Sequence, residues 1–327
     1  MKIDFISTDP RIEIGSYRIW VHDLSQMLRF LGHDARVLTD PRSVRVDSVG
    51  IFSKGDYLLA KDVNCRARGA INISSDTSYD FLDFIIVGSI EEKLSVLRNY
   101  DNVHIVNLIE AMYENFDLKQ HENKKTLTIG YHGSYTHLSK VQFGFVKAFN
   151  SLKEDGLDIR FKTVTNQPKF ATQICNQLGL NAEHSLWNFK TIASEIKEFD
   201  IGIVINCSDI TQMHPQLMNL TNTHSGLYTT DYAYRYKNKS NPGRNFVLYQ
   251  LGIPVICDLT PSNIPMIFDE SCGKIAACEK TWKMAIQSLK QAEVRNFIAR
   301  NAKNRFLSMY NREKEALDLV SFLEKLS

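Results

Sequence analysis

Short apolar runs alternate with helical stretches along this chain, and this alternation constrains the fold more than any other feature. In the first half, six runs read as buried strands: Lys2–Ser7, Ala35–Leu38, Val49–Phe52, Ala70–Ile73, Phe84–Val87 and Val103–Val106. Between the first two, Tyr17–Phe30 carries apolar residues at helical spacing, and Gly32 supplies a helix end. Strands that alternate with helices pair in parallel, with helices on both faces of the sheet.

The second half repeats this scheme. Its expected strands are Leu127–Tyr131, Ile159–Thr163, Ile201–Ile205 and Pro254–Ile256, and its main helices are Trp282–Gln291, Glu293–Met309 and Arg312–Leu326. A polar stretch at Lys119–Lys125 separates the halves. We therefore expect an α/β protein of two doubly wound, Rossmann-like domains, residues 1–120 and 121–310, with a last helix over 311–327. Such domains bind ligands at the carboxyl ends of their strands, here in a central cleft.

Chain length and charge exclude some classes of protein. The 327 residues are too many for one ordinary core, and 39 basic against 37 acidic side chains do not suit a nucleic-acid partner. Residues 1–118 hold 13 basic and 18 acidic side chains, so the remainder holds 26 and 19. An anionic ligand is therefore expected mainly on the second half, although uneven surface charge would give the same count.

Cysteine usage and apolar run length indicate a cytoplasmic location. The six cysteines show no C-x-x-C spacing, which suits a reducing compartment and predicts neither a zinc ribbon nor a disulfide scaffold. Residues 1–10 turn acidic before any apolar stretch, unlike a signal peptide. The longest apolar runs are far shorter than the roughly 20 residues that span a bilayer.

The segment from Tyr234 to Ile256 is the most informative for function. Basic residues stand at positions 235, 237, 239 and 244. They surround an expected helix start, where Ser240 or Asn241 can act as the cap and Pro242 fits the first turn. A helix start offers N–H groups and a positive dipole end, which suit a phosphate. The alternative is a solvated basic loop that caps a core helix.

Two glycine–serine pairs are candidate ligand-approach points. Gly15-Ser16 and Gly133-Ser134 each follow an expected strand and precede a helix. Their backbone N–H groups could approach a sugar or phosphate closely, or each pair could be only a tight turn. Neither is a full G-x-G-x-x-G or P-loop motif, which counts against an NAD-dependent dehydrogenase or epimerase and against an ATP site.

Three further residues are candidate catalytic groups. Asp76 ends an expected strand and would lie at the ligand edge of its sheet, unless it only caps the next turn. Lys54 could balance Asp76, or lie on the surface as most lysines do. His132, near the end of the first strand of the second domain, is the best placed of nine histidines for a substrate role, although most histidines are unspecialised.

The segment around residues 240–255 resembles the donor-binding signature of GT-B glycosyltransferases, particularly the family 4-like enzymes of bacterial surface polysaccharide synthesis. Ser240, Arg244 and Leu251–Val255 match that signature. Shorter matches extend over nearly the whole chain, at Ile14–Ser16, Leu31–Thr39, Ile51–Lys54, Ile73–Asp76, Ile129–Ser134 and Tyr310–Arg312. The resemblance implies a GT-B fold, with an acceptor domain over 1–120, a nucleotide-sugar donor domain over 121–310, and a last helix that crosses back to the first domain.

The resemblance also implies roles. The expected donor-binding residues are Gly133, Ser134, Lys239, Ser240, Arg244 and Asn245, and the expected acceptor-side loop is Gly15 with Ser16. A GT-B site stabilises the leaving diphosphate with cationic side chains and a helix dipole, so we expect no metal and no cofactor. Two glutamates of the commonest family pattern are here Lys239 and Val247, so the ribose must be held elsewhere. The long stretch Cys207–Tyr236 reads as an acceptor loop or a lid.

The resemblance thus implies a metal-independent glycosyltransferase of bacterial cell-surface polysaccharide synthesis that retains anomeric configuration. Its partners would be a nucleotide-sugar donor and a glycan or lipid-linked acceptor. A lipid-linked acceptor would require peripheral association with the inner membrane, yet the first half shows no basic amphipathic anchor. The alternative is a non-catalytic nucleotide- or glycan-binding protein of the same fold, suggested by the missing glutamate pair.

Overall fold

The computed structural model describes residues 1–73, 78–142, 144–206 and 241–326. The chain divides into two compact units. The first contains Met1–Glu114, Asn241–Phe246 and Leu307–Ser327, and the second contains Asn115–Ser240 and Val247–Phe306. Within the described ranges, no helix is both long and apolar enough to cross a bilayer.

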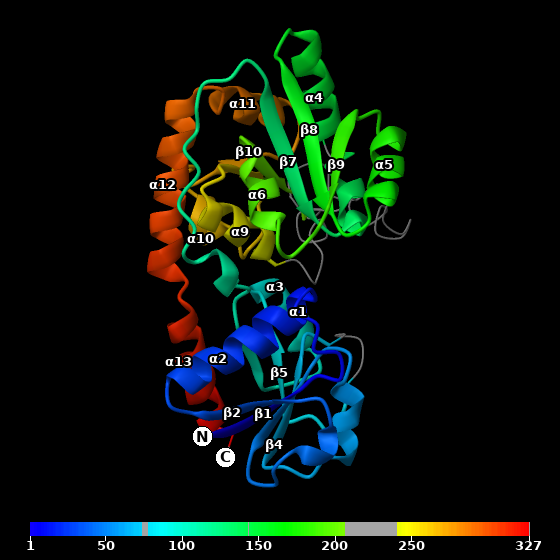
Figure 1. Cartoon of the computed structure of the whole chain (residues 1–327), viewed down its shortest axis with the longest axis vertical. Coiled ribbons are helices and arrows are strands. Elements are labelled where there is room, and N and C mark those ends of the chain that lie inside the picture. The colour runs from blue at the N-terminus through cyan, green and yellow to red at the C-terminus, as the bar shows by residue number, and fades with distance from the viewer. Residues whose placement is uncertain (74–77, 143, 207–240, 327) are drawn as a thin grey trace, which may run out of the picture. The chain divides into compact units, whose positions relative to one another are not determined.

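A six-stranded parallel sheet forms the centre of the first unit (Figure 1). Its strands are β1 (Lys2–Ile6), β2 (Asp34–Leu38), β3 (Val49–Phe52), β4 (Ala67–Ile71), β5 (Phe84–Val87) and β6 (Val103–Ile105). Their order in space is β2-β1-β3-β4-β5-β6. The chain leaves β1 in one direction and returns to β3 on its other side, so the loops after these two strands diverge at the topological switch point.

Helices cover both faces of this sheet. One face packs against a continuous helix of α1 (Gly15–Tyr17), the π-helical segment η1 (Arg18–Asp23) and α2 (Leu24–Phe30), together with α13 (Arg312–Glu324). The other face packs against α3 (Ile90–Val96) and the 3-10 turn η3 (Tyr57–Asp62). Two more 3-10 turns are η2 (Pro41–Ser43) and η4 (Ala111–Tyr113). Apolar residues at helical spacing explain this packing, because Trp20, Leu24 and Leu28 all lie in the core.

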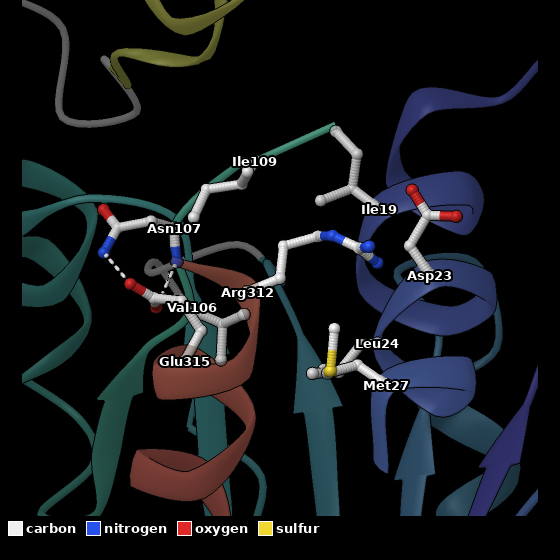
Figure 2. A pocket seen from close by; sticks show the side chains of 9 residues that line it. All are labelled: Ile19, Asp23, Leu24, Met27, Val106, Asn107, Ile109, Arg312 and Glu315. Carbon is white, nitrogen blue, oxygen red and sulfur yellow. Dashed lines mark hydrogen bonds between the residues drawn. The ribbon is translucent and has the colours of Figure 1, made fainter. Parts of the chain in front are cut away.

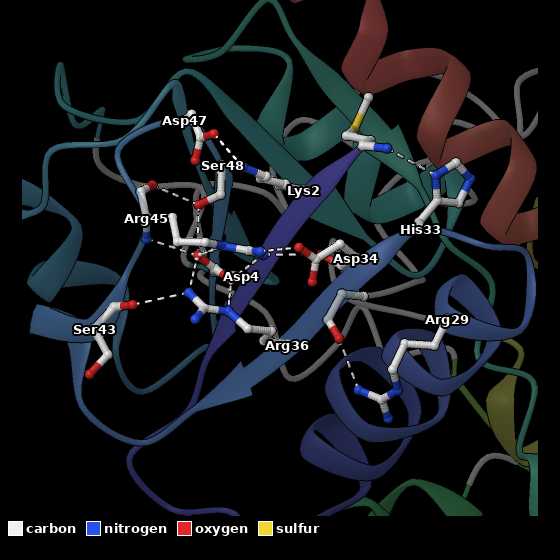
Figure 3. A network of polar contacts seen from close by, with 12 residues as sticks. Lys2, Asp4, Arg29, His33, Asp34, Arg36, Ser43, Arg45, Asp47 and Ser48 are labelled. Carbon is white, nitrogen blue, oxygen red and sulfur yellow. Dashed lines mark hydrogen bonds and ion pairs between the residues drawn. The ribbon is translucent and has the colours of Figure 1, made fainter.

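A fully buried carboxylate, that of Asp4, ties the amino-terminal part of this sheet together (Figure 3). Arg36 donates to it from β2 at 2.8 and 2.9 Å. Arg45 donates at 2.8 and 3.2 Å from its side chain and at 2.9 Å from its backbone. Ser48 Oγ adds a bond of 2.7 Å. These donors outweigh the desolvation of the buried carboxyl and hold the pKa of Asp4 far below its usual value.

A second six-stranded parallel sheet forms the centre of the second unit (Figure 1). Its strands are β7 (Leu127–Gly133), β8 (Ile159–Thr165), β9 (Ala182–Leu186), β10 (Ile201–Val204), β11 (Val255–Cys257) and β12 (Lys274–Ile275). The order in space is β12-β11-β10-β7-β8-β9, which puts the switch point between β7 and β10. The helical elements of this unit are η5 (Tyr135–Gln142), α4 (Phe145–Glu154), α5 (Pro168–Gln177), α6 (Ile192–Lys197), α10 (Ile264–Ile267) and α11 (Glu279–Ser288). Two helices belong to both units: residues 243–246 of α9 (Gly243–Leu251) and residues 307–309 of α12 (Ala292–Met309) lie in the first unit, and the rest of each helix lies in the second.

Close packing against β10 positions α9. An alanine methyl group at Gly202 would lie 2.6 Å from a methyl carbon of Leu248, so the missing side chain lets the helix approach the strand. The residues from Phe246 to Leu251 are all buried, and Gly252 ends the helix in the left-handed conformation. The sheet therefore fixes the carboxyl-terminal half of α9, which leads straight into β11.

The predicted α/β fold of two doubly wound units is confirmed, with some boundaries corrected. The expected strand at Ala70–Ile73 is observed at Ala67–Ile71 and is followed by Asn72 in a left-handed conformation. Gly133 belongs to β7, where a turn was expected. The helix that follows this strand, α4, begins at Phe145, after the 3-10 segment η5.

Candidate functional site

The start of α9 is an N-terminus with a side-chain cap, as the sequence predicts. Asn241 is the cap, since its Oδ1 accepts a hydrogen bond of 3.3 Å from the backbone N–H of Gly243. Pro242 occupies the first turn, and its carbonyl accepts from Phe246 N at 3.0 Å. Arg244 lies half-buried in this first turn, and Asn245 beside it is buried. The geometry suits an anion, because dipole, N–H groups and guanidinium are combined at one helix end.

A buried glutamate from another helix contacts this start. Glu92, in the first turn of α3, is 2% exposed. Its Oε1 accepts from Asn241 Nδ2 at 3.3 Å, and its Oε2 accepts from Gly88 N at 2.6 Å. The capping residue Ser89 accepts from Glu92 N at 3.0 Å, which orients the first turn of α3. Glu92 therefore connects the loop after β5 to the start of α9.

Burial raises the pKa of Glu92 to about 7. Its two hydrogen bonds and the positive charge of Lys54 oppose this rise, while the neighbouring Glu91 adds to it. Lys54, an exposed residue after β3, thus acts on the same group as the α9 start. In the first unit, Glu92 therefore interacts both with Lys54 and with the turn that carries Arg244. The sequence did not predict a role for Glu92. The Ser89-x-x-Glu92 capping signature was the available signal.

Asp56 orders the loops at the switch point of the first sheet. Its carboxylate accepts from Thr8 N at 3.0 Å and Thr8 Oγ1 at 2.5 Å, after β1, and from Ser53 Oγ at 2.6 Å, after β3. The side chain of Asp56 is buried. The position of Lys54, next to Ser53, is therefore fixed by a carboxylate that links two strand ends.

Gly15 and Ser16 form the first turn of the helix that continues to Phe30. Ile14 precedes them in an extended conformation and gives no side-chain cap. The buried Arg18 holds the preceding loop, donating to the carbonyl of Ile12 at 2.8 Å and to Glu110 at 2.6 Å. A helix start without a side-chain cap has backbone N–H groups that a ligand could bind, and the acceptor-side role of Gly15 and Ser16 stays a prediction.

The end of β7 carries three predicted residues of the second unit. His132 is buried, and Gly133 has a φ of 126°, a conformation in which a side chain would be strained. Tyr131 Oη donates to the carbonyl of Ser134 at 2.8 Å, and Ser134 Oγ lies 2.9 Å from the hydroxyl of Thr136. The backbone after β7 is thus held in a fixed bend at the switch point of the sheet.

Two polar residues that the sequence analysis did not select follow the neighbouring strands. Asn206 comes after β10 and Asp258 after β11, and both side chains are buried. Asp258 Oδ2 accepts from Asn206 N at 2.7 Å, and Asn263 Nδ2 donates to the carbonyl of Asp258 at 3.3 Å. The signal in the sequence was their position directly after an apolar strand, where α/β proteins place ligand-binding groups.

Other predicted residues are not placed in these groups. Asp76, Lys239 and Ser240 lie outside the described residues, as does the Cys207–Tyr236 stretch. A small pocket between η1, the segment after β6 and α13 contains no predicted site residue (Figure 2). Glu315 at its edge accepts from Asn107 N and Nδ2 at 2.9 and 2.8 Å. In the described part of the chain, no three His, Cys, Asp or Glu side chains are arranged to hold a metal ion.

Solved structures match the chain at low sequence identity. TarM matches with a TM-score of 0.59 and 10% identity, over 91% of this chain and 57% of that one, so the chain spans little more than half of TarM. A glycosyltransferase from Rickettsia africae ESF-5 matches with a TM-score of 0.62 and 12% identity, over 99% and 98%. Anabaena HepE, crystallised with UDP, matches with a TM-score of 0.55 and 10% identity, over 99% and 100%.

No known protein family and no curated protein matches the sequence itself. The structural matches therefore establish the fold, and any chemical activity has to be inferred from the residues of this chain. The fold of the chain is that of the GT-B glycosyltransferases, with two units that are each built on a parallel six-stranded sheet.

Proposed function

We propose that this protein is a nucleotide-sugar-dependent glycosyltransferase, and that the start of α9 binds the diphosphate of the donor. The observation that carries this proposal is the first turn of α9, which is capped by Asn241 and carries Arg244. Lys239 and Ser240, which precede the cap in the sequence, belong to the same proposed donor-binding element. The crystallisation of HepE with UDP supports a nucleoside diphosphate as the ligand class.

Transfer of a sugar requires stabilisation of the negative charge that builds on the leaving diphosphate. The guanidinium of Arg244 and the positive end of α9 supply this stabilisation without a metal. A charge-assisted hydrogen bond contributes roughly 1.5–3 kcal/mol, so Arg244 alone accounts for about a tenfold to hundredfold difference in affinity. Catalysis by these groups follows if they bind the diphosphate more tightly as its charge develops.

Further residues belong to the proposal. Gly133, Ser134 and Asn245 are proposed donor-binding residues, and Gly15 with Ser16 is the proposed acceptor-side loop. Lys54, Asp76 and His132 are the proposed catalytic residues. The finer proposal is that the enzyme retains anomeric configuration and builds a bacterial cell-surface polysaccharide on a glycan or lipid-linked acceptor.

Calorimetric titration with UDP, GDP, CMP and ADP tests the donor site. We expect one nucleotide to bind, and Arg244→Ala to weaken that binding at least tenfold. Arg42→Ala is the matched control, because Arg42 is a largely exposed arginine that, among the residues the structure describes, pairs with Asp40 alone. Absence of binding by all four nucleotides, or equal affinity of wild type and Arg244→Ala, would contradict the proposal.

Turnover separates an enzyme from a non-catalytic binding protein. The purified protein is incubated with the sugar donor of the nucleotide that binds, and release of that nucleotide is followed with and without EDTA. Release in both samples is the expected result. Tight binding without any hydrolysis or transfer would favour the non-catalytic alternative.

A further inference from the structure

The carboxylate of Glu92, in the first unit, is buried and forms no ion pair with any residue that the structure describes. Glu92 has a backbone amide on one oxygen and a side-chain amide on the other, at 2.6 and 3.3 Å. Lys54, the positive charge that acts on it, is itself exposed. The helix α3 already has its cap in Ser89, so the second oxygen of Glu92 is not needed to start that helix. This second oxygen, Oε1, accepts the hydrogen bond from Asn241 instead.

The chemistry of the two side chains fixes the orientation of Asn241. An ionised carboxylate only accepts hydrogen bonds, so the amide of Asn241 must turn its NH₂ group toward Glu92. The amide oxygen then points the other way, to the N–H of Gly243 at 3.3 Å, where it caps α9. The polarity of Glu92 thus determines whether Asn241 presents its oxygen or its nitrogen to the helix start.

We propose that Glu92 is a positioning residue of the donor site, which holds Asn241 in its capping orientation and so fixes the first turn of α9 and Arg244 for a nucleoside diphosphate. This inference rests on the proposed function. Glu92 acts through its hydrogen bond with Asn241. A neutral group at position 92 places a donor where Asn241 now donates, so the amide flips and the cap is lost.

Glu92→Gln tests this polarity with almost no change of shape. If the glutamine oxygen accepts from Gly88, its NH₂ group faces Asn241 and forces the flip. We expect Glu92→Gln and Asn241→Ala each to weaken nucleoside diphosphate binding at least fivefold, and the double variant to bind no more weakly than either single variant. The control is Glu315→Gln, another glutamate that bonds a backbone N–H and an asparagine amide, in this case those of Asn107.

The titration uses UDP, GDP and ADP on the full chain, with circular dichroism to confirm that each variant is folded. Binding by Glu315→Gln within twofold of wild type is expected. Wild-type affinity in Glu92→Gln, or additive losses in the double variant, would overturn the inference while leaving the proposed function intact if Arg244→Ala still weakens binding.

The pH dependence gives a readout that a merely structural role would not move. Wild-type binding should fall toward that of Glu92→Gln as the pH drops from 8 to 6, while the variant shows only the dependence of the nucleotide itself. The groups that act on Glu92 are Glu91 and Lys54, so Glu91→Gln should lower the midpoint of the wild-type curve. Parallel pH curves for wild type and Glu92→Gln would overturn the inference.

Amide hydrogen exchange covers the case in which no nucleotide binds. Loss of the cap in Glu92→Gln should increase exchange at residues 243–246 at least threefold at pH 8, with no change in β3. Unchanged exchange there would overturn the positioning role independently of any ligand. Faster exchange in a protein that binds no nucleotide would support the positioning role and contradict only the proposed function.

Discussion

Asp4 and Glu92 are two buried carboxylates of the same unit with opposite electrostatics. Asp4, within β1, receives two arginines and a serine, and its pKa lies far below the usual value. Glu92, after β5, receives two amides, and its pKa rises to about 7. The first carboxylate stabilises the fold as an anion, whereas the second is costly as an anion. A costly buried charge after the carboxyl end of β5 fits the functional role proposed for Glu92, whereas a compensated charge within β1 fits a stabilising role.

Asp4→Asn should have the largest effect on stability. The substitution leaves the partly buried Arg36 and Arg45 without their shared anion, and loss of one partner of such a buried pair costs about 3 kcal/mol. The free energy of unfolding from urea titration at pH 7 measures the change. A loss below about 1 kcal/mol would show that the network is not a stability element.

Lowering the pH should show the same network in the wild-type protein. Because the pKa of Asp4 is depressed in the folded state, its contribution is present above the unfolded pKa, about 3.9, and is lost as the pH falls below that value. Asp4→Asn should therefore show a weaker decrease in stability in acid than wild type.

Glu92→Gln should change stability in the opposite direction. The pKa of Glu92 rises from about 4.5 to about 7 on folding, so its stabilising contribution is complete below pH 4.5 and is lost as the pH rises through 7. The variant should gain stability relative to wild type between pH 5 and pH 8.5, by up to about 3 kcal/mol. Urea titrations at four pH values give this difference, and a difference independent of pH would remove the contrast with Asp4.

Asp47→Asn should have the smallest effect. Asp47 pairs with Lys2 at 2.6 Å, but both side chains are well exposed. Solvent screening therefore leaves this pair only a small contribution to stability. A loss of stability as large as that of Asp4→Asn would mean that burial does not explain the difference between the two carboxylates. As a control, 1 M NaCl should remove most of the measured effect of Asp47→Asn.

Much of the fold could be predicted because buried parallel strands are short and apolar. The bounds of β3 and β5 agree with the expected Val49–Phe52 and Phe84–Val87. The edge strand β9 was missed because Ala182–Leu186 is only partly buried and shows no apolar run. The start of β4 was not predicted because Arg68 and Gly69 interrupt the apolar run. Gly69 is nevertheless compatible with the strand, because the ring of Phe84 packs against it.

The site could be predicted only where one segment carries its own signal. Asn241 and Pro242 predict a helix start from their own residue types, and α9 begins there in the structure. Glu92 is 149 positions away from Asn241, and no local pattern links the two. Asp258 and Asn206 likewise meet only because β10 and β11 are neighbours in the sheet. Contacts between residues that are far apart in the chain could therefore not be predicted from the sequence alone.

A crystal structure with a nucleoside diphosphate bound tests the central claim most directly. We predict that the β-phosphate lies within hydrogen-bond distance of the guanidinium of Arg244, at the Asn241-capped start of α9. A nucleotide bound elsewhere on the chain, with Arg244 and the α9 start out of contact with its phosphates, would contradict the account.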